Sequence, residues 1–132
     1  IPLLNTSNVS DMSYMFEGCS SLTTIPLLNT SNVTYMGSMF NNCSSLTTIP
    51  FLNTSSVSDM GYMFFNCSSL TYIPLLDTSN VTNMNSTFSN CTSLPLVDKV
   101  LFLDKSNNDF KRQIYLQMSQ EQLQQTYNNL IV

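Results

Sequence analysis

The stretch IPLLNTSNVTYMGSMFNNCSSLTT, residues 25–48, decides the fold, because near-copies of it fill most of the chain. The same pattern occupies residues 1–24, 49–72 and 73–96, so it recurs every 24 residues with no insertion. A repeat of this length with recurring Leu, Ile and Phe is typical of a solenoid, because one unit cannot bury its own apolar face and its neighbours must cover it. We therefore predict four stacked units.

The hydrophobic spacing changes within each unit, which predicts a strand followed by a helix. Residues 22–28 follow the L-x-x-L-x-L spacing of leucine-rich repeats and predict a short strand with alternating faces. Residues 30–32 are Thr-Ser-Asn, which are helix N-cap residues. Apolar residues three or four apart then predict one buried helical stripe. In this unit the stripe consists of Val33, Met36, Met39, Phe40 and Cys43.

Prolines and left-handed residues mark fixed positions of every unit. A proline lies inside each predicted strand, and because proline cannot donate to a ladder we expect only three or four paired residues, with the proline at or past the strand end. Just before each cysteine stands Gly or Asn, the residue types that most easily adopt a left-handed conformation. The prolines are Pro2, Pro26, Pro50 and Pro74, and the left-handed positions are Gly18, Asn42, Asn66 and Asn90.

The last quarter of the chain departs from the repeat and predicts a terminal cap over residues 97–132. The apolar residues 100–103 indicate one strand, and the alternation at 114–118 indicates another. Residues 119–122 have the spacing of a helix capping box, and a helical apolar face follows at Leu123, Tyr127, Leu130 and Ile131. The chain stops on an apolar pair, so we expect the cap to be cut short. The predicted fold class is α/β, a leucine-rich-repeat solenoid of four strand–turn–helix units with a C-terminal strand/helix cap.

Composition excludes several classes of function. The 132 residues fit one domain, and eight acidic against four basic residues give a net charge of −4. All basic residues lie after residue 98, so most of the surface cannot neutralise phosphates; we expect no nucleic-acid partner and no docking on anionic membranes. The chain has no histidine, which excludes Ser-His-Asp and Cys-His catalysis and His-ligated zinc. No apolar run approaches the roughly 18–20 residues of a membrane span, so we expect no membrane insertion. We expect no cofactor and no enzymatic activity.

The cysteine column admits three interpretations. Cys19, Cys43, Cys67 and Cys91 fall at one position of the repeat. In neighbouring units the Cα atoms of these cysteines should come within disulfide range, but side chains that point in parallel rarely suit the dihedral angle of a disulfide. A copper(I) site with the nearby methionines is a second alternative. We favour a buried ladder of free thiols, because Cys packs as a small apolar residue.

Polar columns also carry alternatives. Asn5, Asn29 and Asn53 begin Asn-x-Ser/Thr triplets, which are glycosylation acceptors in secreted eukaryotic proteins. A glycan at every coil would crowd the stack, so we favour a structural turn ladder. Rows of threonine could bind ice or a crystalline polysaccharide, but here they lie where the predicted helices need caps.

Columns that vary between units are the candidate recognition surface, because exposed Tyr and Phe at repeated spacing suit protein or sugar contacts. Ordinary surface variation is the alternative explanation. One set lies on the predicted strand face and consists of Thr24, Leu28, Thr48, Pro50, Leu52, Tyr72, Pro74 and Leu76. The other set lies beside the predicted helices and consists of Tyr14, Tyr35, Tyr62 and Phe65. No catalytic or metal-binding residue is predicted.

The recurring string V-x-x-M-x-x-M-F-x-x-C-S-S-L resembles the BspA-like leucine-rich repeats of bacterial surface proteins. Related repeats occur in mycoplasma-type lipoproteins and in bacteriophage proteins. The resemblance covers residues 1–96, and the fourth unit departs from it at Asp77 and Thr87, where other units have Asn and Met.

The resemblance implies a secreted or surface-displayed protein with no shared catalytic motif. The expected function is a non-enzymatic adhesion or binding module on a bacterial surface or a phage particle. Its expected ligand is a protein or a glycan on a host or neighbouring cell. The alternative is a structural spacer or a component that decorates a virion or its tail.

Overall fold

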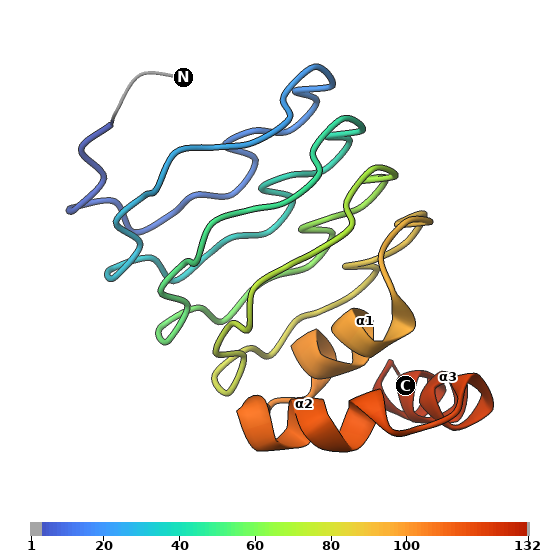
Figure 1. Ribbon diagram of the computed structural model, residues 1–132. Helices are drawn as coiled ribbons and strands as arrows, with labels where there is room; N and C mark the ends of the chain where they lie inside the picture. The colour runs from blue at the N-terminus through green and yellow to red at the C-terminus, as the bar shows by residue number, and fades with distance from the viewer. Residues whose placement is uncertain (1–3, 132) are drawn as a thin grey trace.

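The computed structural model describes residues 4–131, in which successive repeat units form coils that lie one above the other (Figure 1). Helices follow the last coil at the C-terminal end: α1 (Leu96–Leu103), α2 (Asp109–Leu116) and α3 (Gln120–Leu130). Pro2 of the first predicted strand and Val132 of the predicted cap lie outside the described residues. Among the helices of residues 4–131, none is long and apolar enough to cross a membrane.

A parallel ladder joins the coils along one side. Around its first bridge the Met12 N–H donates to the Tyr35 carbonyl at 2.9 Å, and the Thr34 N–H donates back to the Ser10 carbonyl at 2.8 Å. Because the units are near-copies, the same exchange recurs between later coils. The bridges join Asp11 to Tyr35, Tyr35 to Asp59 and Asp59 to Asn83.

The prediction of a strand at the proline-containing segment was wrong. Pairing there is limited to the isolated bridge between Thr48 and Tyr72, within the described coils. Each of these residues stands two positions before a proline, so Pro50 and Pro74 lie past the paired residue, as expected. Residues 49–53 donate no backbone hydrogen bond to a neighbouring coil in the described structure. The proline therefore removes no ladder bond, since the backbone bonds between coils on this side are donated by Thr47 and Thr71, before the proline.

The predicted helices of the units were also wrong. Residues 12–19, 36–43, 60–67 and 84–91 each form a ribbon of consecutive turns, here called a turn ribbon. In the second coil the N–H groups of Met39, Asn41 and Cys43 donate to the carbonyls three residues earlier, at 3.0–3.2 Å. The N–H groups of the alternate residues, including Phe40, donate to the next coil instead.

The turn ribbon explains why the helical spacing was misleading. The turn ribbon buries the same apolar stripe that a helix would bury, so the three- and four-residue spacing of that stripe does not separate the two structures. A helix would direct these N–H groups four residues back along the chain and leave none to join the coils. Positive φ angles break the helix, and those at Gly18 and the asparagines confirm the predicted left-handed positions. The residues are Tyr14 (64°), Gly18 (75°), Ser38 (56°), Asn42 (64°), Tyr62 (57°), Asn66 (61°), Ser86 (55°) and Asn90 (63°).

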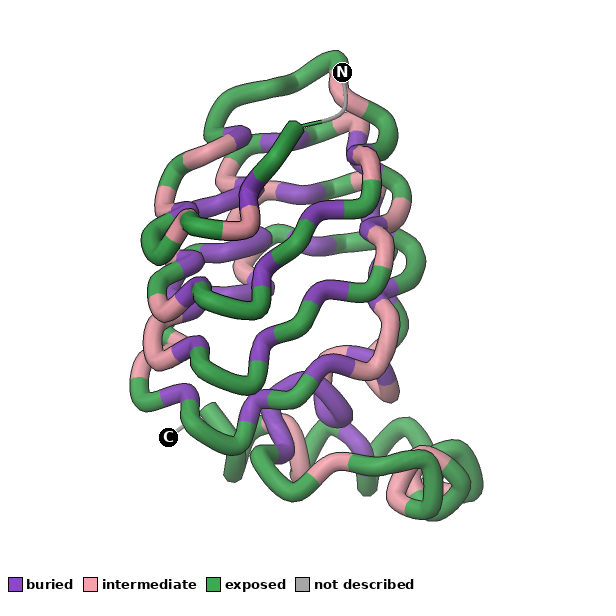
Figure 2. The backbone as a smooth tube through the Cα atoms, turned by 90° about the vertical axis from the view of Figure 1, so that its left-hand side faces the viewer, coloured by how far each residue is buried: buried purple, intermediate pink, exposed green. Residues whose placement is uncertain are grey.

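The core consists of columns that run along the stack. Figure 2 shows buried and exposed stretches recurring in register from coil to coil. The rings of Phe16, Phe40, Phe64 and Phe88 stack nearly parallel, with centroids 5.6–5.9 Å apart. Phe102 of α1 meets the rings of Phe64 and Phe88 edge-on and packs against the side of the column.

The cysteine column is a ladder of free thiols, which confirms the favoured interpretation. The Cys43 thiol donates to the Phe16 carbonyl at 3.0 Å, and Cys67 and Cys91 repeat this contact in the following coils. Cys43, Cys67 and Cys91 are buried, whereas Cys19 at the open end of the stack is exposed. A buried thiol thus packs against the stack and satisfies a carbonyl of the preceding coil.

Each coil turns a corner through an Asn or Asp side chain. In the second coil the Asn29 Oδ1 accepts from the Ser31 N–H at 3.1 Å and from its hydroxyl at 2.7 Å. The buried Thr30 hydroxyl donates to the Asn53 carbonyl of the next coil at 2.8 Å. These residues form an Asx turn and a threonine ladder, so their predicted helix-capping role was wrong and the predicted turn ladder is confirmed.

A fifth corner begins where the repeat sequence ends. The Asp104 carboxylate accepts from the Ser106 N–H and hydroxyl at 2.9 Å, as Asp77 does from Ser79 in the fourth coil. The Thr78 hydroxyl donates to the Asp104 carbonyl at 3.3 Å. Residues 104–107, Asp-Lys-Ser-Asn, thus repeat the corner of residues 77–80, Asp-Thr-Ser-Asn, after 27 positions instead of 24.

Helices replace the predicted strands of residues 97–132. Residues 100–103 belong to α1, and 114–116 belong to α2. A short apolar run does not separate a strand from a helix, and here Pro95 precedes the first turn while Asp98 lies within it, both favourable at a helix start. The predicted capping box is confirmed: the Gln122 N–H donates to Ser119 Oγ, and the Ser119 N–H donates to Gln122 Oε1.

Candidate binding surfaces

In each of the last three units two large apolar residues follow the proline, as Leu27 and Leu28 follow Pro26, and the predicted strand-face site contains the second of the two, which is the buried one. Leu28, Leu52 and Leu76 are buried in the core, so they cannot form part of a free surface. The inward residues of this segment are Leu22, Ile25 and Leu28, which are three positions apart. Three residues per turn is the period of a polyproline-type extended chain, which suits a segment built around a proline. The predicted two-residue alternation therefore failed after Ile25.

The preceding leucine of each pair lies outside and forms an apolar stripe. Leu27 is 68% exposed and Phe51 is 59% exposed, and Leu75 continues the column half-buried. Tyr72 is exposed on the same segment of the chain, two residues before Pro74. We call this surface the proline–leucine face. It consists of Thr24, Pro26, Leu27, Thr48, Pro50, Phe51, Tyr72, Pro74 and Leu75.

The chemistry of the proline–leucine face is apolar and uncharged. None of its residues is acidic or basic. The hydroxyls of Thr24 and Thr48 lie 3.5 and 3.4 Å from the carbonyls of Ile25 and Ile49, within their own coils. The face therefore presents Leu, Pro and aromatic surface at repeated spacing, which suits contact with apolar groups of another molecule.

The second predicted set lies beside the turn ribbons and is partly confirmed as exposed. Tyr14, Tyr35 and Tyr62 are exposed, and Phe65 is half-buried with its ring 5.6 Å from that of Tyr62. Charged and polar residues interrupt this set, because Tyr35 stands between Asp11 and Asp59 in the column of bridged residues, which ends with Asn83. A hydrogen bond from the Ser13 N–H lowers the pKa of the Asp11 carboxyl, which holds a negative charge at this end of the column.

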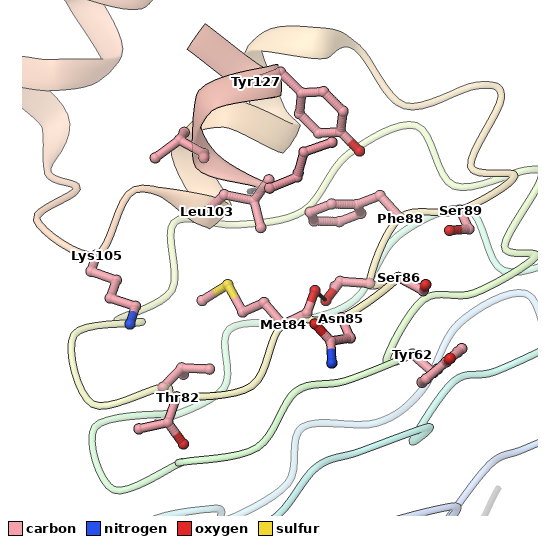
Figure 3. A pocket seen from close by; sticks show the side chains of 14 residues that line it. Tyr62, Thr82, Met84, Asn85, Ser86, Phe88, Ser89, Leu103, Lys105 and Tyr127 are labelled. Carbon is pink, nitrogen blue, oxygen red and sulfur yellow. Dashed lines mark hydrogen bonds between the residues drawn. The ribbon is translucent and has the colours of Figure 1, made fainter.

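A groove that the sequence did not reveal lies between the last coil and α3. Its volume is about 650 Å³. In Figure 3, Met84 and Phe88 of the last coil face Leu103 and Tyr127 across the groove, and Lys105 lies near one end. The signal that could have indicated it is the Asp-Lys-Ser-Asn corner of residues 104–107. That corner lies between α1 and α2 and shows that helices replace the rest of a fifth coil.

The buried thiols are poor candidates for chemistry. Burial raises the pKa of Cys43 and of Cys91 to about 11, and burial also raises the pKa of Cys67. Each thiol therefore stays protonated near neutral pH, and the thiolate is the reactive form. Within residues 4–131, no three His, Cys, Asp or Glu side chains are grouped to hold a metal ion.

Comparison with known proteins gives one family and one similar structure. Residues 1–99 match the family described as "Mycoplasma protein of unknown function, DUF285". No curated protein matches the chain. Among solved structures, the T. pallidum leucine-rich repeat protein TpLRR is similar, with 20% sequence identity and a TM-score of 0.49. The match covers 65% of this chain and 50% of TpLRR, so it spans about half the length of that protein.

Proposed function

The chain belongs to the DUF285 family, and from that premise we propose that it is a non-enzymatic repeat module that binds a protein ligand at a bacterial surface. We also propose that its coils form a solenoid of the leucine-rich-repeat type and that the module is displayed outside the cell. The family match supports it at a coarse level, since the repeat string also resembles mycoplasma-type surface repeats.

The observation that carries the proposal is the proline–leucine face. Large apolar side chains that are exposed in one continuous column mark interaction sites more often than scattered ones do. Leu27, Phe51 and Leu75 form such a column on coils held together by hydrogen bonds, so binding would cost little ordering of the backbone. The face is apolar, carries no charge and offers few polar groups for hydrogen bonds to sugar hydroxyls, which favours a protein ligand over a glycan.

Absence of charge on this face predicts how binding responds to salt. Exposed ion pairs weaken as ionic strength rises, whereas apolar contact does not. We therefore expect binding that is insensitive to salt.

A test compares a variant of the proline–leucine face with a matched variant on α2. The variant L27S/F51S removes the two most exposed side chains of the column. The control, Ile114→Ser, removes an exposed apolar side chain far from it in sequence. Labelled protein is applied to intact bacteria, immobilised matrix proteins and a glycan array at low and high salt.

The proposal predicts binding to a protein target that L27S/F51S abolishes and that Ile114→Ser retains. Equal loss in both variants would contradict a site on this face. Binding confined to glycans would overturn the choice of a protein ligand.

A structural role is the second candidate, as a spacer or as part of a virion or its tail. The observation that favours it is the near-identity of the coils, which makes a stiff rod without a unique site. If folded protein binds none of the targets, the structural role becomes the better explanation.

A further inference from the structure

The last turn ribbon presents N–H groups that lack the partner they have in every earlier coil. In the third coil the N–H groups of Met60 and Tyr62 donate to the carbonyls of Asn83 and Asn85 at 2.9 Å, and that of Phe64 donates at 3.1 Å. Within residues 4–131, helices and not a further coil follow the fourth coil. Within residues 4–131, the structure gives no acceptor for the equivalent N–H groups of Met84, Ser86 and Phe88.

One carbonyl completes this row. The Ser58 N–H donates to the Thr34 carbonyl at 2.9 Å, and the Thr82 N–H donates to the Ser58 carbonyl at 2.8 Å. The Thr82 carbonyl is the next acceptor in the column, and no described residue donates to it. The end of the stack therefore offers one acceptor followed by four donors at alternate residues, since the Asn90 N–H also has no acceptor among the described residues. Such a row is an open edge for another chain.

The groove described above runs along this edge. Thr82, Met84, Ser86 and Phe88 all line it (Figure 3). Leu130 and Ile131, at the end of α3, line it as well. Its volume of about 650 Å³ lies within the ~300–1,000 Å³ of typical ligand sites.

The helices leave room for one segment and not for a full coil. A second row of backbone hydrogen bonds joins the coils, in which the Thr47 N–H donates to the Thr23 carbonyl and the Thr71 N–H donates to the Thr47 carbonyl. Pro95 is the next residue in this row, and proline has no N–H to extend it. The ring of Phe102 lies 5.1 Å from that of Phe88 and 5.8 Å from that of Phe64, so α1 packs against the side of the phenylalanine column at its last coil. A complete unit of a second copy could therefore not extend the row of hydrogen bonds that Thr47 and Thr71 form.

We propose that this groove binds a single peptide segment of a partner protein, which adds to the last coil in parallel and takes the turn-ribbon conformation of an earlier coil. Its carbonyls at alternate residues accept from Met84, Ser86 and Phe88, and one of its N–H groups donates to the Thr82 carbonyl. Main-chain bonds give such an added segment its affinity, and neighbouring pockets select its side chains. The wall of Leu130 and Ile131 selects apolar side chains.

This site does not use the proline–leucine face, so it can fail or succeed independently of the function proposed above. Its probe is a blocked synthetic peptide with the sequence of residues 34–41, Thr-Tyr-Met-Gly-Ser-Met-Phe-Asn. Within the stack the carbonyls of Tyr35, Gly37 and Met39 in this stretch accept from the corresponding donors of the first coil. Titration of isotope-labelled protein follows individual backbone amides by NMR.

We expect the amide protons of Met84, Ser86 and Phe88 to move downfield together as the peptide saturates the groove. Ile131→Asp places a charge in the apolar wall and should weaken peptide binding about tenfold. Leu116→Asp is the matched control, because Leu116 also lies at a helix end and is 56% exposed against 55% for Ile131. It should change the affinity less than about twofold.

Absence of movement at these three amides at millimolar peptide would overturn the proposal, as would equal weakening by the two variants. If the amides respond to protein concentration and not to the peptide, the occupant is a second copy and the peptide partner is wrong. The titration of the unmodified protein decides the matter even if Ile131→Asp disturbs α3.

Discussion

The coils and the C-terminal helices are stabilised in different ways. Nearly every coil residue that points inward is buried against the coils on both sides, and rows of equivalent side chains run through the stack. By contrast, α2 buries none of its residues and α3 buries only Leu123 among those described. Helix α1 connects the two regions, because it buries Phe102 and Leu103 in the core of the coils. Stability in the coils is thus shared between neighbours, whereas α2 and α3 depend on a few local contacts.

The largest effect should come from the phenylalanine column. Phe64 is fully buried between Phe40 and Phe88, and Phe64→Ala should lower the free energy of unfolding by about 4 kcal/mol, the usual cost of removing a buried aromatic ring. The comparison is with Leu123→Ala in α3, which should cost about 2 kcal/mol. Urea unfolding monitored by circular dichroism measures both.

Hydrogen exchange separates the two variants further. Phe64→Ala should raise exchange throughout the coils, because each coil is stabilised by its neighbours. Leu123→Ala should raise exchange only in α3. If both variants loosened the whole chain equally, the helices would be as cooperative as the coils and the comparison would fail.

The threonine ladder should give the next largest effect. The buried Thr54 hydroxyl donates to the Asp77 carbonyl at 2.6 Å. Thr54→Val keeps the shape of the side chain but leaves that carbonyl without its donor, and should cost about 1–2 kcal/mol. The exposed Thr47 hydroxyl donates to the Thr23 carbonyl at 3.3 Å, and water can replace it. Thr47→Val should therefore change the midpoint of urea unfolding very little, and equal costs would contradict a special role for the buried row.

The contact between α2 and the fifth corner should depend on pH. Burial alone would raise the pKa of Asp104, but hydrogen bonds from Tyr115, Lys111 and Ser106 outweigh it and lower the pKa to about 2. A carboxyl whose pKa is lowered by folding stabilises the protein above its unfolded pKa of about 4, and that contribution is lost as the pH falls towards 2. Asp104→Asn should cost about 1 kcal/mol at pH 7, after allowance for solvent screening, and much less at pH 2.

Thermal unfolding from pH 7 to pH 2 measures this difference. Burial raises the pKa of Tyr115, and the Asp104 carboxylate raises it further, to about 12. The phenol therefore keeps its proton and its hydrogen bond to Asp104 throughout that pH range. A cost of Asp104→Asn that did not change with pH would show that the corner depends on shape and not on charge.

The sequence predicted what recurs and failed where two structures share one spacing. The 24-residue period, the buried stripe and the left-handed Gly and Asn positions follow from residues that repeat in register. The turn ribbon was not predicted because a turn ribbon and a helix bury the same positions of the sequence. The two structures differ in their hydrogen bonds, since alternate N–H groups of the ribbon donate to the next coil. Leu28 was predicted on the outer face but is buried, and Leu27 is exposed instead, because the chain around Pro26 follows a three-residue period. The groove has no sequence motif of its own, since it exists only where α1 ends the stack.

The smallest perturbation compares the two ends of the coils through their thiols. Cys19 is exposed at the first coil, whereas Cys91 in the last coil is buried and its thiol donates to the Phe64 carbonyl at 2.9 Å. Burial raises the pKa of Cys91 to about 11, so at pH 8 little thiolate is present. An alkylating reagent should modify Cys19 within minutes and leave Cys91 intact until the protein unfolds, as mass spectrometry of digested protein would show. Tyr127 of α3 packs against the core at this end, so rapid alkylation of Cys91 would mean that the helices leave the last coil often. Protection of Cys91 equal to that of Cys67 would instead mean that α1 and α3 cover the last coil as well as another coil would, even though they leave its N–H groups unpaired.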